Sequence, residues 1–320
     1  MSASIDVMGA GAFGSALAIA LARGGREVRL WCRDPAQAAA MERDRTVPRL
    51  PGVALPEDIA VTADAAEMTA PIRLLAVPMQ ALGGHLAEHC PPPATAMIAC
   101  CKGIDLATRQ GPSALIAAQV PQAVPAVLTG PSFAADIARG LPTALTLACA
   151  ETTRAEALQT ALSTETLRLY RSADPIGAEL GGALKNVVAI AAGLVMGAGL
   201  GESARAALMT RGYVEMQRLA RHLGAQPTTL AGLSGFGDMV LTATSTQSRN
   251  FAFGEALGAG HRPKDGITVE GRATAQAVAG IAAAEGLDMP ICTMVSAVID
   301  ETLTIEQAMG ALMSRDLREE

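Results

Sequence analysis

Three closely spaced glycines, in Gly9-Ala-Gly11-Ala-Phe-Gly14, join a short apolar run at 5–8 to an alanine-rich stretch at 12–23. The run is typical of a buried strand and the stretch of a helix. In a strand-turn-helix unit Gly9 permits the tight turn, Gly11 lets a pyrophosphate approach the backbone, and Gly14 lets helix and strand pack closely. The alternative is a chance turn in a glycine-rich chain. The context favours a dinucleotide site, with phosphates at the helix N-terminus.

The first half of the chain alternates apolar runs with helical stretches. Strands are expected at 5–8, 27–31, 72–77, 95–100, 124–129, 143–148 and 166–170, with helices at 12–23, 79–89 and 151–162 among those between them. The proline-containing connector 44–57 is expected to form a long surface loop. Such alternation predicts a parallel sheet covered on both faces. The first domain is therefore predicted to be an α/β, Rossmann-type doubly wound sheet over residues 1–174.

Beyond Asp174-Pro175 the strand pattern fades and helical patterns take over. Helices are expected at 176–197, 203–223, 228–243, 247–258, 269–286, 291–302 and 305–317. Thr304 and Gln307 have the spacing of a capping box before the last of these. Residues 175–320 are thus predicted to be an all-helical domain. An α/β domain followed by a helical one suggests that the cofactor binds the first and the substrate binds between the two.

Composition limits the class of protein. With 320 residues the chain has room for two cores, and half of its residues are hydrophobic. The net charge of −6 argues against nucleic acid as the main partner. The sequence suggests no metal site. The scattered cysteines, among them Cys100 and Cys101 in an expected buried strand, indicate a reducing cytoplasm.

Neither a leader nor a membrane span is expected. The N-terminus leads directly into the first predicted strand. The apolar run 187–200 is too short to cross a bilayer comfortably and lacks interfacial aromatic residues. It is better interpreted as part of a buried helix, with a subunit contact as the alternative.

The end of the second expected strand bears on the choice of cofactor. Sites for NAD alone usually carry an acidic residue there, for the ribose 2′-hydroxyl. Here Arg33 precedes Asp34, and an arginine can meet a 2′-phosphate. We therefore expect NADP to be accepted, either alone or alongside NAD; the alternative is that Arg33 is a solvated loop charge.

Lysine occurs at three positions only, Lys102, Lys185 and Lys264, whereas arginine is common. Unlike arginine, lysine can exchange a proton near neutral pH when burial lowers its pKa. Lys185-Asn186 lies in an apolar helical stretch, so Lys185 is a candidate proton donor or acceptor. The alternative is a lysine whose ammonium group reaches water. Lys264, in a Pro- and Gly-containing loop, is interpreted as a surface charge.

A second group of polar residues follows. Asp238 and Thr242 are four apart and share one face if helical. Ser248, Arg249 and Asn250 begin an expected helix, where an arginine and free N–H groups could hold a phosphate. The alternative is a helix cap with a surface arginine.

The segments G-A-G-A-F-G, C-K-G, G-P-S-F-A, L-K-N-V, G-F-G-D, Q-S-R-N and V-E-G occur in this order. Together they resemble the bacterial NAD(P)-dependent sn-glycerol-3-phosphate dehydrogenase family along nearly the whole chain. The resemblance implies reversible reduction of dihydroxyacetone phosphate to sn-glycerol 3-phosphate with NAD(P)H, which supplies glycerophospholipid synthesis. It also suggests a homodimer.

The resemblance implies roles for individual residues. Lys185 corresponds to the catalytic proton acceptor, which is the donor in the reductive direction. The substrate would contact Lys102, Gly130, Ser132, Lys185, Asn186, Asp238, Ser248, Arg249 and Asn250. The cofactor would contact Gly9, Gly11, Ala12, Phe13, Gly14, Arg33, Lys102, Ala134, Arg249, Thr268 and Glu270. Asp238 is expected to orient Lys185 and offset the local positive charge.

Four positions depart from the commoner family pattern: Ala12, Cys101, Ser132 and Ser203. None of them removes a charge that the reaction needs. Two alternative functions remain. One is another β-hydroxyacid-type dehydrogenase, such as a 3-hydroxyisobutyrate or ketopantoate enzyme, which the Q-S-R-N segment disfavours. The other is a non-catalytic NAD(P)-binding sensor, which would need only the first half of the chain.

Overall fold

A computed structural model describes residues 3–89, 91–92, 94–262 and 268–314. The first half forms one eight-stranded sheet in the order β3-β2-β1-β4-β5-β6-β7-β8. Its strands are β1 (Ser4–Met8), β2 (Glu27–Trp31), β3 (Ile59–Thr62), β4 (Ile72–Leu75), β5 (Ala96–Ala99), β6 (Val124–Thr129), β7 (Thr143–Ala148) and β8 (Leu167–Ser172). The order reverses between β1 and β4, which is where doubly wound sheets bind ligands.

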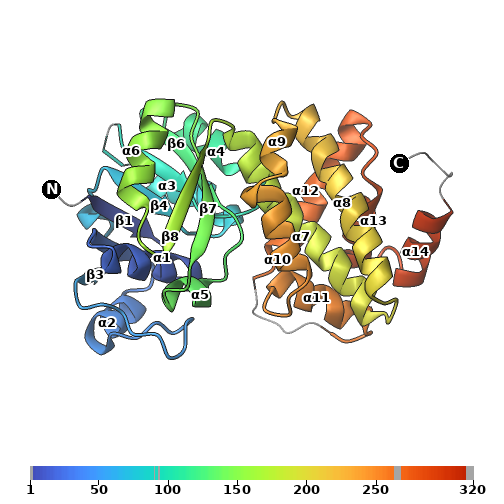
Figure 1. Cartoon of the computed structure of the whole chain (residues 1–320), viewed down its shortest axis with the longest axis horizontal. Helices are drawn as coiled ribbons and strands as arrows, with labels where there is room; N and C mark the ends of the chain where they lie inside the picture. Colours follow the sequence, from blue (N-terminus) through green and yellow to red (C-terminus); the bar gives the residue numbers. More distant parts are fainter. Residues whose placement is uncertain (1–2, 90, 93, 263–267, 315–320) are drawn as a thin grey trace.

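Helices cover both faces of this sheet, as the sequence predicts (Figure 1). They are α1 (Ala12–Arg23), α2 (Pro35–Asp44), the short η1 (Ala65–Glu67), α3 (Met79–Glu88), α4 (Pro112–Gln119), α5 (Ala134–Ala138) and α6 (Thr152–Leu162). The core on one face includes α1 and α6, and the core on the other includes α3 and α4. Apolar cores therefore lie on both faces of the sheet.

The expectation of a wholly parallel sheet is wrong at one pair. β7 runs antiparallel to β6, and β8 then pairs parallel with β7. The connection from β6 to β7 contains only the short α5, so the chain turns back beside the strand it has left. A parallel neighbour requires a crossover over one face of the sheet, which α6 provides between β7 and β8.

Two details of the first half differ from the sequence expectations. β3 was not expected; it follows the connector 44–57, which itself contains an isolated antiparallel bridge between Thr46 and Ala54. β5 ends at Ala99, so Cys100 and Cys101 lie beyond the strand, although both are buried as expected.

The second half is helical, as predicted. Its elements are α7 (Pro175–Gly197), α8 (Glu202–His222), α9 (Pro227–Leu230), η2 (Leu233–Gly237), α10 (Asp238–Ala243), α11 (Arg249–Gly258), α12 (Glu270–Glu285), α13 (Pro290–Ile299) and α14 (Ile305–Met313). The capping box of Thr304 and Gln307 is confirmed at the start of α14. The positions of Lys264 and of 315–317, the end of the last expected helix, lie outside the described residues.

Helix α7 is the centre of the helical half, and the other helices gather around it (Figure 1). In the described part of the chain it is the one helix long and apolar enough to cross a membrane, but 89% of its most apolar window is buried inside the protein. That burial confirms the expectation of a core helix.

The expected helix over 228–243 is wrong as a single element. It is broken into α9, the π-helical turn η2 and α10. Glycines explain the break: a side chain at Gly235 would lie 2.1 Å from the Leu230 carbonyl oxygen. The α7 backbone also passes closely here, since a Cβ at Gly181 would be 2.7 Å from the Ser234 carbonyl oxygen. Asp238 begins α10 directly after the turn.

Helices α7 and α11 touch through their backbones. A Cβ at Gly193 would lie 2.2 Å from the carbonyl oxygen of Phe251, and one at Gly254 would lie 2.1 Å from that of Ile190. Gly197 and Gly258 repeat the contact one turn further along each helix. Only glycine allows this approach, which fixes α11 and its N-terminal residues relative to α7.

Candidate functional site

The glycine turn between β1 and α1 has the geometry that a dinucleotide requires. Gly9 has φ +121°, and a Cβ there would lie 2.6 Å from the Ala76 carbonyl oxygen. A Cβ at Gly14 would lie 2.0 Å from the Gly9 carbonyl oxygen. At Gly11, the N-cap of α1, nothing lies within 4 Å of that position. The turn is therefore closed where helix meets strand and open where a pyrophosphate would approach.

Two neighbours of this turn were also expected near the cofactor. Ala12 and Phe13 begin α1 and are partly buried against the sheet core, and Ala134, the first residue of α5, packs on the same core. Helices α1 and α5 pack against each other. The structure thus brings Ala134 to the side of the sheet that carries the glycine turn.

Arg33 and Asp34 follow the end of β2 and are both exposed. Asp34 is the N-cap of α2, where its Oδ1 accepts a hydrogen bond from the Ala36 amide at 2.9 Å. The Asp34 carboxylate therefore caps α2, while the Arg33 side chain is exposed to solvent at the end of β2.

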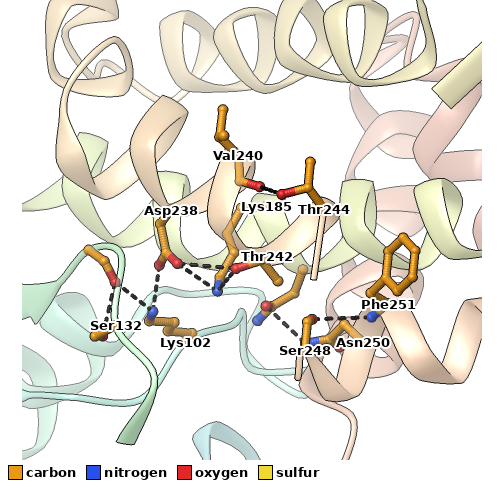
Figure 2. A network of polar contacts seen from close by, with 12 residues as sticks. Lys102, Ser132, Lys185, Asp238, Val240, Thr242, Thr244, Ser248, Asn250 and Phe251 are labelled. Atoms are coloured by element: carbon orange, nitrogen blue, oxygen red, sulfur yellow. Dashed lines mark hydrogen bonds and ion pairs between the residues drawn. The ribbon is translucent and has the colours of Figure 1, made fainter. Parts of the chain in front are cut away.

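Lys185 lies in the middle of α7, and only 6% of its surface is exposed. Its Nζ donates hydrogen bonds to Asp238 Oδ1 at 2.9 Å and to Thr242 Oγ1 at 2.6 Å (Figure 2). The alternative of an ammonium group reaching water is therefore wrong. Burial lowers the pKa of Lys185 to about 8; Asp238 opposes this shift and the charge of Lys102 adds to it.

Lys102 reaches the same carboxylate from the sheet. It follows β5, and its Nζ lies 2.5 Å from Asp238 Oδ2 and 3.3 Å from the Gly130 carbonyl oxygen. Burial opposes ionisation of Asp238, but the two lysines outweigh it and lower the pKa of this carboxyl group. Asp238 is therefore an ionised carboxylate held between two ammonium groups.

Thr242 is a site residue whose contact with Lys185 the sequence did not reveal. One turn after Asp238 on α10, its hydroxyl accepts from Lys185 and donates to Asp238 Oδ1 at 3.2 Å. The shared face of Asp238 and Thr242 was predicted from their spacing. That this face meets Lys185 depends on the packing of α10 against α7.

The loop after β6 brings Gly130 and Ser132 to Lys102. The Ser132 hydroxyl donates to the Gly130 carbonyl oxygen at 3.1 Å, the same oxygen that Lys102 contacts. Gly130 has φ +142°, a backbone conformation that other residues rarely adopt. Figure 2 shows Ser132, Lys102 and Asp238 in one continuous chain of contacts.

The start of α11 supplies the next group. Ser248 caps the helix by accepting from the Phe251 amide at 3.2 Å, and Arg249 is exposed, so the helix-cap interpretation holds for their structure. Asn250 Nδ2 donates to Asn186 Oδ1 at 2.9 Å, and Asn250 Oδ1 accepts from the Gly271 amide at 3.0 Å. Asn250 thereby ties α11 to the residue beside Lys185.

Glu270 begins α12 and reaches across to the first half, where its Oε1 lies 3.5 Å from the Met79 amide nitrogen. Burial raises its pKa, while the charges of Arg249, Lys102 and Lys185 act in the opposite direction. Glu270 therefore lies close enough to the two lysines and Arg249 for their charges to act on it. Thr268 is exposed on the connection before α12.

The site therefore joins both halves of the chain. It combines an open helix N-terminus with a buried ammonium group of depressed pKa, a second ammonium group on the same carboxylate, and an exposed guanidinium group. Such a set can place a phosphorylated carbonyl compound beside a bound dinucleotide and exchange a proton with its oxygen.

Comparison with known proteins gives consistent matches along the chain. Residues 4–155 match the NAD-dependent glycerol-3-phosphate dehydrogenase N-terminus, and residues 174–310 match the corresponding C-terminus. The chain is 59% identical to the glycerol-3-phosphate dehydrogenase (NAD(P)+) of Cereibacter sphaeroides, over 99% of this chain and 100% of the relative. It is 58% identical to the enzyme of the same name from Paracoccus denitrificans, over 99% of this chain and 100% of that relative. The crystal structure of glycerol-3-phosphate dehydrogenase from Coxiella burnetii superposes with a TM-score of 0.92 at 36% identity, covering 98% of this chain and 99% of that one.

Proposed function

Because the chain belongs to the NAD-dependent glycerol-3-phosphate dehydrogenase family, we propose that Lys185 is the proton donor when this enzyme reduces dihydroxyacetone phosphate to glycerol 3-phosphate with NAD(P)H. Family membership sets aside the two alternatives, a different β-hydroxyacid dehydrogenase and a non-catalytic sensor.

One observation supports the role of Lys185 above all: it is a buried lysine whose pKa is lowered to about 8 and whose ammonium group is oriented by Asp238 and Thr242. A general acid is most effective when its pKa lies near the working pH. An arginine at this position would remain charged in both directions of the reaction.

The chemical step divides between cofactor and protein. NAD(P)H, when bound, supplies the hydride that is added to the carbonyl carbon. Negative charge then builds on the carbonyl oxygen, and Lys185 Nζ stabilises that charge and transfers a proton to the oxygen. In the reverse direction neutral Lys185 accepts the hydroxyl proton. Asp238 keeps the ammonium group in place and offsets its charge.

We assign the substrate-binding residues by their position around Lys185. Arg249 offers a planar fork to the phosphate, and Ser248 and Asn250 hold the start of α11 in place. Asn250 Nδ2 donates a hydrogen bond to Asn186 Oδ1, so we assign the Asn186 Nδ2 group as a donor to the substrate. Lys102, beside Gly130 and Ser132, adds positive charge on the opposite side of Asp238.

Cofactor binding is assigned to the glycine turn and its surroundings. The N-terminus of α1 at Gly11 receives the pyrophosphate, and Arg33 receives the 2′-phosphate of NADP. The remaining cofactor contacts are assigned to Gly9, Ala12, Phe13, Gly14, Lys102, Ala134, Arg249, Thr268 and Glu270.

We further propose that residues 1–174 bind the cofactor and residues 175–320 bind most of the substrate, as two domains. The proposed setting is the cytoplasm, where the product feeds glycerophospholipid synthesis. A homodimer is proposed from the family.

The test is to follow oxidation of NADPH and of NADH with dihydroxyacetone phosphate and, as the matched control, with unphosphorylated dihydroxyacetone. Turnover that requires the phosphate ester supports the assigned site. Equal turnover with both compounds would remove the phosphate role of Arg249.

A further inference from the structure

A buried carboxylate joins α7 to the nucleotide-binding half at a distance from the reacting groups. Glu179 lies on α7, is 8% exposed, and accepts a hydrogen bond through Oε2 from the Ser113 amide at 2.9 Å. Ser113 is in the first turn of α4, on the sheet side of the molecule. The carboxylate therefore binds the N-terminal end of a helix that belongs to the other half of the fold.

Gly111, the N-cap of α4, makes room for this carboxylate. A Cβ at Gly111 would lie 2.1 Å from Glu179 Oε1 and 2.5 Å from its Cδ. The backbone of Gly111 has φ −76° and ψ 167°, which any residue can adopt. The three atoms nearest to such a Cβ all belong to Glu179, so the space that glycine leaves here is filled by this carboxylate, and the two residues fit together across the two halves.

The contact lies on the side of α7 that faces Lys102 and α11, and Lys185 is roughly 120° further around the helix. Glu179, Gly182 and Asn186 are spaced at i, i+3 and i+7, and such residues form one stripe along a helix. A Cβ at Gly182 would lie 2.6 Å from Thr129 Oγ1 and 3.5 Å from the Cγ of Lys102. The stripe therefore meets α4 at Glu179, the residues around Lys102 at Gly182, and α11 through Asn186.

Burial of Glu179 also bears on how it can be replaced. Desolvation raises the pKa of Glu179 to about 7, against the opposing effect of the Ser113 hydrogen bonds and with a smaller contribution from Asp174 in the same direction. Neutral and ionised forms are then both present at neutral pH. The contact needs an acceptor of this size and shape more than it needs a charge.

We propose that Glu179 is a positioning residue, which locks α7 against α4 and so sets where Lys185 stands relative to Lys102 and the bound cofactor. Lys185 is about 9 Å further along the helix axis, at 1.5 Å per residue. A small rotation or slide of α7 at Glu179 is transmitted to Lys185 because the helix is rigid. This inference rests on the proposed function, in which Lys185 acts on the substrate carbonyl.

The test compares Glu179→Ala, Glu179→Gln and Gly111→Ala in the full-length enzyme. Glu179→Ala removes the carboxylate that accepts from Ser113, and Glu179→Gln keeps an acceptor oxygen without the charge. Gly111→Ala leaves Glu179 in place but displaces its carboxylate by steric contact from α4. Gly84→Ala is the matched control, because nothing lies within 4 Å of a Cβ at this exposed helical glycine. We measure kcat and KM for dihydroxyacetone phosphate, the Kd for NADPH and thermal unfolding.

We expect kcat to fall roughly tenfold or more in Glu179→Ala and in Gly111→Ala, because small displacements of reacting groups are costly, while the Kd for NADPH changes less than about twofold. Glu179→Gln is expected to restore most of kcat. In the double variant Gly111→Ala/Glu179→Ala, the second change should add no further loss, since the clash is gone.

Three results would overturn the inference: kcat of Glu179→Ala within about twofold of the parent, no rescue by Glu179→Gln, or multiplying losses in the double variant. If Glu179→Ala does not fold, the other two single variants still test the inference. It fails if Gly111→Ala keeps kcat within about twofold of the parent, or if Glu179→Gln loses kcat by roughly tenfold or more. The role of Lys185 is tested separately by its own substitution, so a failure there is distinguishable from a failure here.

Discussion

Lys102 and Lys185 bind opposite oxygens of one carboxylate, with their Nζ atoms 2.5 Å and 2.9 Å from Asp238 Oδ2 and Oδ1. One lysine comes from the end of a sheet strand and the other from the central helix, so the carboxylate joins the two halves of the chain. Two ammonium groups share one carboxylate, so one positive charge within this trio is left unbalanced. That charge favours a substrate whose oxygen becomes negative during reaction.

Replacing Lys185 by arginine tests proton transfer directly. Arginine keeps the positive charge but does not release a proton near neutral pH. We expect kcat of Lys185→Arg to fall by about 10²- to 10⁴-fold, which is the usual contribution of a general acid, while NADPH binding is retained. Steady-state kinetics and fluorescence titration of NADPH measure the two effects. Turnover close to that of the parent would contradict the assignment.

The pH dependence follows from the pKa of about 8 for Lys185. Reduction requires the protonated amine, so kcat/KM for dihydroxyacetone phosphate should be constant below that pKa and fall as the pH rises through it. Oxidation of glycerol 3-phosphate requires the neutral amine and should rise over the same interval. Opposite limbs in the two directions are the expected result, and parallel profiles would exclude Lys185.

Asp238→Asn should shift the descending limb of the reductive pH profile to lower pH. The carboxylate raises the pKa of Lys185 against the effect of burial, so its removal lowers the pKa further. The fall in reductive kcat/KM should therefore begin at a lower pH than in the parent enzyme. An unchanged limb would mean that Asp238 does not control the protonation of Lys185.

Arg33→Ala tests the cofactor assignment. The guanidinium group is exposed, so its contact with a 2′-phosphate is partly screened, and we expect the KM for NADPH to rise roughly tenfold at low salt. The KM for NADH should stay nearly constant because NADH lacks that phosphate. An unchanged ratio of the two constants would show that Arg33 is a solvated loop charge.

Gly193→Ala tests the backbone contact between α7 and α11. The added methyl group would lie 2.2 Å from the Phe251 carbonyl oxygen, so the variant should lose about 1–3 kcal/mol of unfolding free energy or more. Gly84→Ala, in open space on α3, should instead gain about 0.5–1 kcal/mol. Urea denaturation followed by circular dichroism compares the two. Equal stability of both variants would show that the helices can separate.

What the sequence reveals depends on how local each requirement is. The glycine turn at 9–14 is predictable because strand, turn and helix are adjacent in the chain. The reversal at β7 depends on a short connection whose helix α5 is too small to cross the sheet. The break of 228–243 depends on how closely the α7 backbone passes Ser234 and Gly235.

The site shows the same division. The apolar neighbours of Lys185 suggest burial but leave open an ammonium group that reaches water, whereas the shared face of Asp238 and Thr242 is predictable from their spacing. That this face meets both Lys185 and Lys102 is a consequence of packing between elements far apart in sequence. No local pattern indicates that Glu179 pairs with Ser113.

The glycine contacts between α7 and α11 have a consequence for which substrates fit. Lys185 stands on one of these helices and Arg249 begins the other, and no side chain separates the two backbones where they cross. The separation between the backbones that carry Lys185, the proposed proton donor, and Arg249, the proposed phosphate-binding residue, is thus set by main-chain contact. For an ester with its phosphate one carbon nearer to or farther from the carbonyl, the two helices cannot move to compensate, and only the side chains or the ester itself could adjust. The fixed distance between α7 and α11 therefore favours substrates of one length.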